Sequence, residues 1–383
     1  MKYSIIVPVY NRPDEVGELL ESLSNQTQKD FEVIIVEDGS VKTCKDVCDK
    51  YAGILALHYY NKENSGPGQS RNYGAERANG EWLIILDSDV VLPEGYLAAV
   101  DREIRGYGGA EVRRYEKCSE DESNLAPPYR RTTVPPIVAF GGPDAAHPSF
   151  TPVQKAISYS MTSFFTTGGI RGGKAKLDKF YPRSFNMGIR RDVYLQLGGF
   201  TKMRFGEDID FSYRIVEAGY SPRLFPEAWV WHKRRTDFKK FFRQVYNSGI
   251  ARINLEKRHP GTMKLVHLLP TAFTVGVIAL ILISAVGRAL MHYVDHDQFY
   301  WMCFAPWIPI LFYSFLICID SSIKNKSLKV GILSIPAAFV QLMGYGLGFI
   351  ESWWKRCVRG QNEILPCEQT ESERQAFEKK FYK

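Results

Sequence analysis

The sequence predicts an α/β protein in which a Rossmann-like, mostly parallel sheet is followed by carboxyl-terminal transmembrane helices. Short apolar runs alternate with helical patterns over roughly the first 100 residues, and three long apolar segments follow one another after residue 264. The 383 residues are enough for two or three units of ordinary size. With 45% hydrophobic and 24% charged residues, the composition excludes a collagen-like or a disordered chain.

Four short apolar runs are predicted to be buried strands: Tyr3–Val7, Phe31–Val36, Leu55–Tyr60 and Trp82–Leu86. The segments between them have helical periodicity: Asp14–Asn25, Thr43–Tyr51 and Gly68–Arg77. Continuous apolar strands separated by helices indicate a parallel sheet that is covered on both faces. In such sheets the ligand crevice lies at the carboxyl ends of the strands, so the residues that follow each strand are the first candidates for a site.

The rest of the soluble region begins with a long segment of mixed charge. Residues 106–151 contain two Pro pairs, a pattern typical of a mobile loop. Regular patterning returns near Gln154 and ends at the breaker cluster His259-Pro260-Gly261. We therefore predict two halves of a soluble region, a membrane region and a basic, polar tail: residues 1–105, 106–262, 263–352 and 353–383.

Three apolar segments are predicted to be transmembrane helices: Leu265–Val286, Phe299–Ile319 and Val330–Ile350. They contain 22, 21 and 21 residues, and at about 1.5 Å per residue each covers roughly 30 Å, the thickness of a hydrocarbon core. The alternative is a set of buried helices in a large soluble domain. Three such runs, nearly without charge, seldom adjoin one another in a soluble fold.

The distribution of basic residues leaves the number of crossings open. Basic residues before the first segment and after the second place both flanks in the cytoplasm, which leaves the acidic turn with Asp295 and Asp297 outside. Three full crossings would then export the tail. That tail begins with Lys355, Arg356 and Arg359, which the positive-inside rule keeps inside. Either the rule is outvoted and the chain crosses three times, or one segment is re-entrant, the candidate being the last, which contains Pro336 and Gln341.

The predicted location is the inner cell membrane, with several crossings and a cytoplasmic soluble region. The amino terminus is apolar for too short a stretch to be a signal peptide and has no small-residue cleavage site. The seven cysteines are scattered, without a disulfide framework or a zinc-binding spacing, which indicates a reducing compartment.

The formal charge of +7 favours anionic partners, namely nucleic acid, a phosphate-bearing molecule or an acidic membrane face. Ten Lys and Arg residues lie in residues 233–264, against Asp237 and Glu256. This excess just ahead of a membrane helix indicates contact with anionic lipid or with a phospholipid-linked acceptor. No nucleic-acid-binding motif is present in the sequence, so we predict no nucleic-acid partner.

Asp87 and Asp89 follow the fourth predicted strand. Two carboxylates beside a strand end offer oxygen ligands for Mg²⁺ or Mn²⁺, which in turn bridges to substrate phosphates. On spacing alone Asp-x-Asp is more often a simple turn, and its place at the crevice of a parallel sheet favours the metal site. Asp38, after the second strand, can accept a hydrogen bond from a base or a ribose. Arg71, one turn into a helix that follows a Gly-rich loop, suits a diphosphate.

Two further candidates lie later in the chain. Glu207 and Asp208 follow Gly206 at the start of a predicted helix; they either complement the helix dipole or supply a general base. His232 either ligates the metal or donates to a diphosphate, although a lone His is more often an ordinary hydrogen-bonded residue. The segment from Gly168 to Lys174 spells GxxxxGK, but Ala175 replaces the required Ser or Thr, so it is not a phosphate-binding P-loop.

The motifs taken together resemble family 2 glycosyltransferases over about residues 2–250. The resemblance rests on seven motifs in order: Pro8-Val9-Tyr10-Asn11, Glu37-Asp38-Gly39-Ser40, Gly66 to Arg71-Asn72, Asp87-Ser88-Asp89, Asn186-Met187-Gly188, Gly198-Gly199-Phe200 and Gly206-Glu207-Asp208. It implies a GT-A fold, a nucleotide-diphosphate sugar donor, usually UDP-linked, Mg²⁺ or Mn²⁺, and transfer with inversion.

The resemblance also implies roles for individual residues. Residues 1–105 would bind the nucleotide sugar, and residues 106–262 would form the catalytic and acceptor half. Asp38 would hold the base, Arg71 the diphosphate, Asp87 the nucleoside and Asp89 the metal, with His232 as a second metal ligand. Asp208 would deprotonate the acceptor, with Glu207 as its rival. The remaining implied contacts are those of Pro8, Tyr10 and Asn11 with the nucleotide, and of Asn186 and Gly206 on the side of the sugars.

The carboxyl half resembles membrane-attached exopolysaccharide glycosyltransferases. Gln244 matches the start of the QxxRW motif of processive synthases, but Asn247 and Ser248 replace its Arg and Trp. The glycines of Gly344-Tyr345-Gly346-Leu347-Gly348-Phe349 are expected to let membrane helices approach closely. The favoured hypothesis is transfer of one sugar to a polyprenyl-diphosphate-linked glycan at the membrane; the alternatives are a processive synthase and a catalytically silent nucleotide-sugar-binding scaffold.

Overall fold

The computed structural model describes residues 1–108, 114–117, 129–132, 137–147, 149–167, 180–233, 235–294 and 300–363. The chain forms two compact units. Unit 1 consists of Met1–Ala145, Asp178–Thr201 and Phe211–His232, and unit 2 of Ala146–Leu177, Lys202–Asp210 and Lys233–Lys383. The GxxxxGK segment, part of the predicted loop 106–151 and the tail beyond residue 363 lie outside the described residues.

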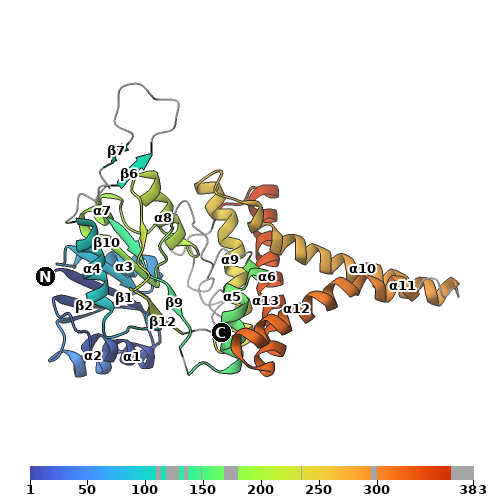
Figure 1. Cartoon of the computed structure of the whole chain (residues 1–383), viewed down its shortest axis with the longest axis horizontal. Coiled ribbons are helices and arrows are strands. Elements are labelled where there is room, and N and C mark those ends of the chain that lie inside the picture. Colours follow the sequence, from blue (N-terminus) through green and yellow to red (C-terminus); the bar gives the residue numbers. More distant parts are fainter. Residues whose placement is uncertain are drawn as a thin grey trace. The chain divides into compact units, whose positions relative to one another are not determined.

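Unit 1 is built on a seven-stranded sheet of order β11-β8-β10-β4-β1-β2-β3 (Figure 1). Its first four strands along the chain are β1 (Tyr3–Val9), β2 (Phe31–Asp38), β3 (Leu57–Lys62) and β4 (Trp82–Leu86). They pair in parallel, in the positions that the apolar runs predicted. The sheet continues through β10 (Asn186–Arg190), which is antiparallel to both β4 and β8 (Ala139–Gly141), and ends with β11 (Arg223–Leu224).

The two faces of this sheet carry separate cores, because side chains alternate along each strand. Ile5 and Val7 of β1 belong to one core cluster, whereas Ile6 between them belongs to the other. Helices α1 (Pro13–Ser24), α2 (Lys45–Tyr51) and α4 (Tyr96–Gly108) contribute to the first cluster, and α3 (Pro67–Glu76) and α7 (Arg191–Gln196) to the second. The mostly parallel sheet covered on both faces confirms the predicted fold class.

Buried polar groups also stabilise the sheet. Glu32 of β2 accepts hydrogen bonds from the Ser4 hydroxyl at 2.6 Å and from the Asn79 backbone N–H at 2.6 Å. Burial alone would raise the pKa of Glu32, but these hydrogen bonds hold it below its ordinary value. The carboxylate therefore favours the folded state as long as it is ionised.

Smaller strands complete unit 1. A three-stranded sheet of order β5-β12-β9 contains β5 (Val90–Val91), β12 (Val230–His232) and β9 (Asp144–Ala145). A separate pair is formed by β6 (Arg114–Lys117) and β7 (Tyr129–Thr132). Helix α8 (Glu207–Glu217) begins in unit 2 and ends in unit 1.

Unit 2 is helical. Its helices are α5 (Pro152–Thr162), α6 (Phe164–Thr167), α9 (Phe238–Arg258), α10 (Leu269–Val294), α11 (Tyr300–Phe304), α12 (Ile308–Asn325) and α13 (Leu328–Trp353). Three stretches are long and apolar enough to span a membrane: Leu265–His292, Ala305–Asn325 and Leu328–Val358. They coincide with the three segments predicted from the sequence, and α13 continues through Pro336 without a break.

The Gly-rich motif of α13 contacts two different helices. A Cβ atom at Gly346 would lie 2.1 Å from the Thr274 hydroxyl of α10, which confirms the expected close approach of two apolar helices. On the other face, a Cβ atom at Gly348 would lie 2.0 Å from the Tyr246 carbonyl oxygen of α9. The second contact differs from the expectation, because α9 is a charged helix outside the three apolar segments.

Candidate functional site

The candidate nucleotide residues lie at one edge of the main sheet of unit 1. Pro8 is inside β1 and faces Val36 in register, while Asp38 is the last residue of β2. Asp87 follows the end of β4 directly. Because these strands are parallel, their carboxyl ends meet at the same edge, as the sequence pattern predicted.

Asn11 holds the loop after β2 in place. Its backbone N–H donates to the Ser40 hydroxyl at 2.7 Å, and its side-chain oxygen accepts from the backbone N–H groups of Val41 at 2.8 Å and Lys42 at 2.9 Å. Its φ of 54° lies in the left-handed region, which Asn tolerates better than most residues. The turn that carries Tyr10 and Asn11 is thus tied to the neighbouring strand end.

Asp38 organises the Gly-rich loop that leads into α3. Its carboxylate accepts hydrogen bonds at 2.9 Å from the backbone N–H groups of both Ser65 and Gly66, and it pairs with Lys62. Gly66 adopts a φ of 91°, which few other residues tolerate. Asp38 therefore shapes the loop in front of the amino end of α3, besides any contact that it makes with a base.

Arg71 and Asp87 contact each other. An Arg71 guanidinium nitrogen lies 2.7 Å from the Asp87 carboxylate, and the guanidinium also stacks over the Phe200 ring at 5.2 Å from its centroid. Arg71 is buried, whereas the Asp87 side chain remains 31% exposed. The buried cation thus orients a carboxylate that is still accessible to a ligand.

Asp89 lies between two basic side chains that come from distant parts of the sequence. Its two carboxylate oxygens lie 2.7 Å from Arg12 and 3.3 Å from the His232 Nε2 atom. Burial alone would lower the pKa of Arg12, but the adjacent Asp89 raises it above its ordinary value. Sequence reasoning missed Arg12, although its position directly after Asn11 at the end of β1 was a usable signal.

Asp87, Asp89 and His232 form a possible metal-binding cluster. Each offers one ligand atom, and these atoms all lie within 4.8 Å of one another. Strand pairing brings His232 there, because β12 places it opposite Val90 of β5, the residue directly after Asp89. Its Nδ1 atom is buried and has no hydrogen-bond partner among the described residues, and its ring stacks on Phe185. Two carboxylates and an imidazole are suitable donors for Mn²⁺ or Mg²⁺.

Asn186 lies in the interior of unit 1. Its amide group donates to the Ala228 carbonyl at 2.8 Å, and its side-chain oxygen accepts from the Tyr96 hydroxyl at 2.6 Å. The residue is 1% exposed. In this arrangement Asn186 links β10 to the segment that leads to β12, and so supports the position of His232.

The candidate base residues belong to unit 2. Glu207 and Asp208 are both buried in the first turn of α8, and Asp208 accepts from the Ile209 backbone N–H at 2.9 Å. Gly206 precedes them with a φ of 85°, and a Cβ atom there would lie 3.2 Å from that of Ala251. This glycine therefore permits both the turn and close packing on α9.

A buried pair next to the candidate base was also missed. The His259 Nε2 atom lies 3.0 Å from an Asp210 carboxylate oxygen, and both side chains are buried in unit 2. His259 ends α9 and Asp210 lies in the first turn of α8. The pair joins the two helices at the turn that carries Asp208.

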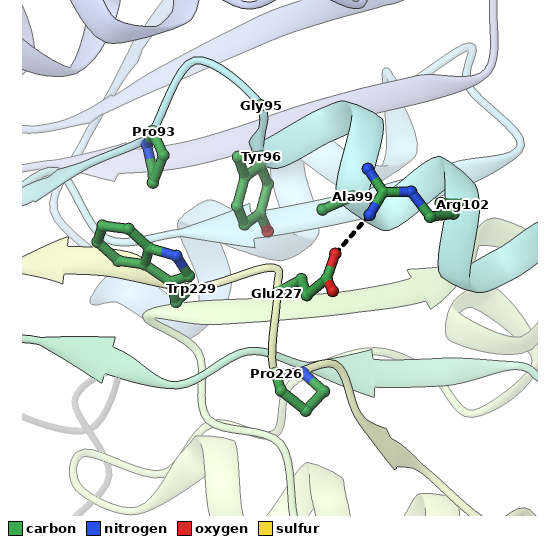
Figure 2. Close-up of a pocket in the computed structure, with 8 residues that line it drawn as sticks. All are labelled: Pro93, Gly95, Tyr96, Ala99, Arg102, Pro226, Glu227 and Trp229. Carbon is green, nitrogen blue, oxygen red and sulfur yellow. Dashed lines mark hydrogen bonds and ion pairs between the residues drawn. The ribbon is translucent and has the colours of Figure 1, made fainter.

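A hollow elsewhere in unit 1 is lined by none of the candidate residues. It has a volume of about 430 Å³ and is lined by α4 and the segment before β12 (Figure 2). Its carboxylate, Glu227, forms an ion pair with Arg102 at 2.5 Å. Both of these side chains are largely exposed, so this shallow hollow offers a nucleotide no buried charge.

Comparison with known proteins supports the family resemblance. Residues 4–133 match the family model described as Glycosyl transferase family 2. Together with the mostly parallel sheet, this match confirms a GT-A type of domain, as predicted. The putative glycosyltransferase EpsH of Bacillus subtilis is 41% identical over 133 residues, which are 33% of this chain and 39% of EpsH.

Other relatives match over shorter stretches. The poly(ribitol-phosphate) beta-N-acetylglucosaminyltransferase TarS of Staphylococcus aureus is 39% identical over 93 residues, 23% of this chain and 16% of TarS. An uncharacterized glycosyltransferase of Haemophilus influenzae is 46% identical over 86 residues, 22% of this chain and 29% of the relative. The chain thus spans less than half the length of these curated relatives.

Solved structures resemble the chain over most of its length at low identity. The mannosyltransferase PcManGT from Pyrobaculum calidifontis, in complex with GDP-Man and Mn²⁺, is 18% identical with a TM-score of 0.49, covering 85% of this chain and 87% of that one. S. aureus TarS 1–349 in complex with UDP-GlcNAc is 15% identical with a TM-score of 0.42, covering 95% and 93%.

Proposed function

Because residues 4–133 match glycosyl transferase family 2, we propose that the protein is an inverting glycosyltransferase that uses a nucleotide-diphosphate sugar, UDP-linked by preference. The observation that carries the proposal is the cluster of Asp87, Asp89 and His232 at the carboxyl ends of the parallel strands. Arg12 and Arg71 lie beside it. Carboxylates for a cation and guanidinium groups for a diphosphate are the two requirements of a nucleotide-sugar site.

Asp87, Asp89 and His232 would hold Mg²⁺ or Mn²⁺. When bound, the cation supplies positive charge that stabilises the departing nucleotide diphosphate. Arg71 lies behind Asp87 and fixes its carboxylate, while Arg12 fixes that of Asp89. The loop shaped by Asp38 presents backbone N–H groups at the amino end of α3, where a helix favours negative charge.

Asp208 is proposed as the base. Its carboxylate takes the proton of the acceptor hydroxyl while the acceptor oxygen forms a bond to the anomeric carbon. The bond from that carbon to the diphosphate oxygen breaks, and its electron pair leaves with the nucleotide. The adjacent Glu207 is the rival for this role, and comparison of Glu207→Gln with Asp208→Asn decides between them.

The acceptor is proposed to be a polyprenyl-diphosphate-linked glycan in cell-surface polysaccharide synthesis, at the cytoplasmic face of the inner cell membrane. Support comes from the three candidate spans of unit 2 and from the exposed basic residues at both ends of α9, namely Lys239, Lys240, Lys257 and Arg258. Basic groups next to a membrane segment attract anionic headgroups and phosphates. The name of one relative, TarS, gives a phosphate-containing polymer, poly(ribitol-phosphate), as its acceptor.

The test is a panel of UDP- and GDP-sugars incubated with the purified full chain, Mn²⁺ and a polyprenyl-diphosphate-linked sugar. We expect release of one nucleotide and addition of one sugar residue. A ladder of products would instead indicate a processive synthase. Binding of nucleotide sugar without release under any combination would overturn the enzymatic proposal and favour a silent scaffold.

A further inference from the structure

The three candidate membrane spans differ in how much of each is covered by protein. Within the most apolar window of each span, 11% of the residues of the first and of the second are buried, against 44% of the third. From residue 337 to residue 352, no side chain of α13 is exposed in the described part of the chain. Apolar residues all around a helix indicate burial, and protein rather than lipid provides it for α13.

Helices α10 and α12 have the opposite character. Large apolar side chains point outward along both, including Ile281 and Leu282 on α10 and Leu311 and Phe312 on α12, each more than half exposed. Figure 1 shows that α10, α11 and α12 run away from the group formed by α5, α9 and α13. An exposed apolar surface of this length is typical of helices that hydrocarbon covers.

Helix α10 and the chain that returns through α11 and α12 form an antiparallel hairpin, whose base packs against Phe339 of α13 through Phe273 and Tyr313. Ser284 of α10 accepts a hydrogen bond from the indole N–H of Trp307 at 2.8 Å and donates one to the Cys303 carbonyl at 3.2 Å. Nearer the base of the hairpin, Phe273 of α10 contacts Tyr313 of α12. The hydroxyl and indole groups of this contact are thus paired, as a hydrocarbon environment requires.

Helix α13 lies alongside α9 through most of its length. Near its middle, the side chains of Val245 and Phe242 contact Gly344. Further along, the Ser352 hydroxyl donates to the Ile250 carbonyl at 3.2 Å, and past its end the Lys257 ammonium group donates to the Arg356 carbonyl at 2.7 Å. The two helices are therefore parallel and run side by side.

A bilayer crossing by α13 would therefore carry α9 into the hydrocarbon. Helix α9 contains seven charged residues: Lys239, Lys240, Arg243, Arg252, Glu256, Lys257 and Arg258. Insertion of one Arg, Lys or Asp at the centre of a membrane helix costs about 2.5–3.5 kcal/mol even on the most permissive scale. This cost excludes α9 from the bilayer, and α13 with it.

The basic residues of the sequence agree with two crossings. If α10 and α12 alone cross, three basic groups share the cytoplasmic side: Lys257, Arg258 and Lys264; Lys324, Lys326 and Lys329; and Lys355, Arg356 and Arg359. The acidic residues Asp295 and Asp297 of the sequence are then outside. Three crossings would export the last basic group, against the positive-inside rule.

We infer that α10 and α12 form a hairpin that spans the lipid bilayer, and that α13 stays with α5 and α9 on the cytoplasmic side. Unit 1 is on that side too, because the described residues between His232, where unit 1 ends, and α9 contain no candidate span. The segment Lys355–Arg359 then faces the cytoplasm. The inference rests on the membrane location proposed above and is independent of the reaction.

Cysteine labelling tests this placement. Cys357 is exposed, so a full-length variant with Cys357 as its single cysteine can be treated with a membrane-impermeant maleimide in sealed vesicles of known orientation. Two matched controls carry the single cysteine elsewhere: Lys326→Cys in the turn between α12 and α13, and His292→Cys near the far end of α10. We expect Cys357 to react like Lys326→Cys, in inside-out vesicles only, and opposite to His292→Cys.

Labelling of Cys357 from the outside would overturn the inference, and so would labelling only after detergent treatment. Because removal of buried cysteines can disturb folding, the unaltered chain provides a second measurement. Trypsin added to inside-out vesicles should cleave after Lys355, Arg356 or Arg359, and trypsin added to right-side-out vesicles should not. Sugar transfer, measured on the same vesicles, is a separate readout, so failure of the topology and failure of the proposed function are distinguishable.

Discussion

Removal of the Asp89 charge should abolish cation binding while leaving the fold of unit 1 largely intact. Asp89 contributes one of three potential ligand atoms, and its two oxygens also face Arg12 and His232. In Asp89→Asn the Arg12 guanidinium loses its ion-pair partner, and Asp87 and His232 remain as the other potential ligands. Removal of a residue that only hydrogen-bonds to a metal ligand typically lowers the affinity for the metal by 10–100-fold. Removal of a ligand itself should therefore lower the Mn²⁺ affinity by at least about 100-fold.

The assay is Mn²⁺ binding followed by electron paramagnetic resonance, with and without UDP, which requires no turnover. His232→Ala, which removes another of the three potential ligand atoms, should likewise weaken Mn²⁺ binding by at least about 100-fold. Glu227→Gln is the matched control, because it removes an exposed carboxylate of unit 1 that lines the separate hollow. Unchanged Mn²⁺ affinity in Asp89→Asn, or an equal loss in Glu227→Gln, would refute the assignment of the cluster.

Three further perturbations have equally definite expectations. Asp208→Asn should retain UDP binding and lower the turnover of sugar transfer by roughly 10²–10⁴; turnover close to wild type would reject it as the base. Gly348→Leu, which drives a side chain into the α9 backbone, should destabilise the chain in detergent by about 1–3 kcal/mol. Its control is Gly276→Leu, which has no atom within 4 Å of its Cβ position and should leave the melting temperature nearly unchanged. Equal melting temperatures of the two variants would contradict the α9–α13 packing. The low folded-state pKa of Glu32 stabilises the fold above the unfolded value of about 4.3, so stability should fall as the pH drops below it, with a smaller drop in Glu32→Gln; identical acid-unfolding profiles would contradict this.

The residues at the strand ends were predictable because parallel strands bring their carboxyl ends to one edge. Apolar runs located β1, β2, β3 and β4, and Asp38, Asp87 and Asp89 followed from counting along the chain. Arg12 could have been found in the same way. The strand positions and the residues that follow them are consequences of local periodicity, which can be read directly from a sequence.

The sequence alone determined that the chain has a parallel α/β sheet with acidic groups at its edge and three apolar segments behind it. Tertiary structure decided the rest, because long-range pairing is not encoded in local pattern. The pairing of β12 with β5 places His232 beside Asp89, and glycines of α13 seat it against α9. Hydropathy cannot tell whether lipid or protein covers an apolar helix, so only the packing of α9 along α13 shows that protein covers that helix.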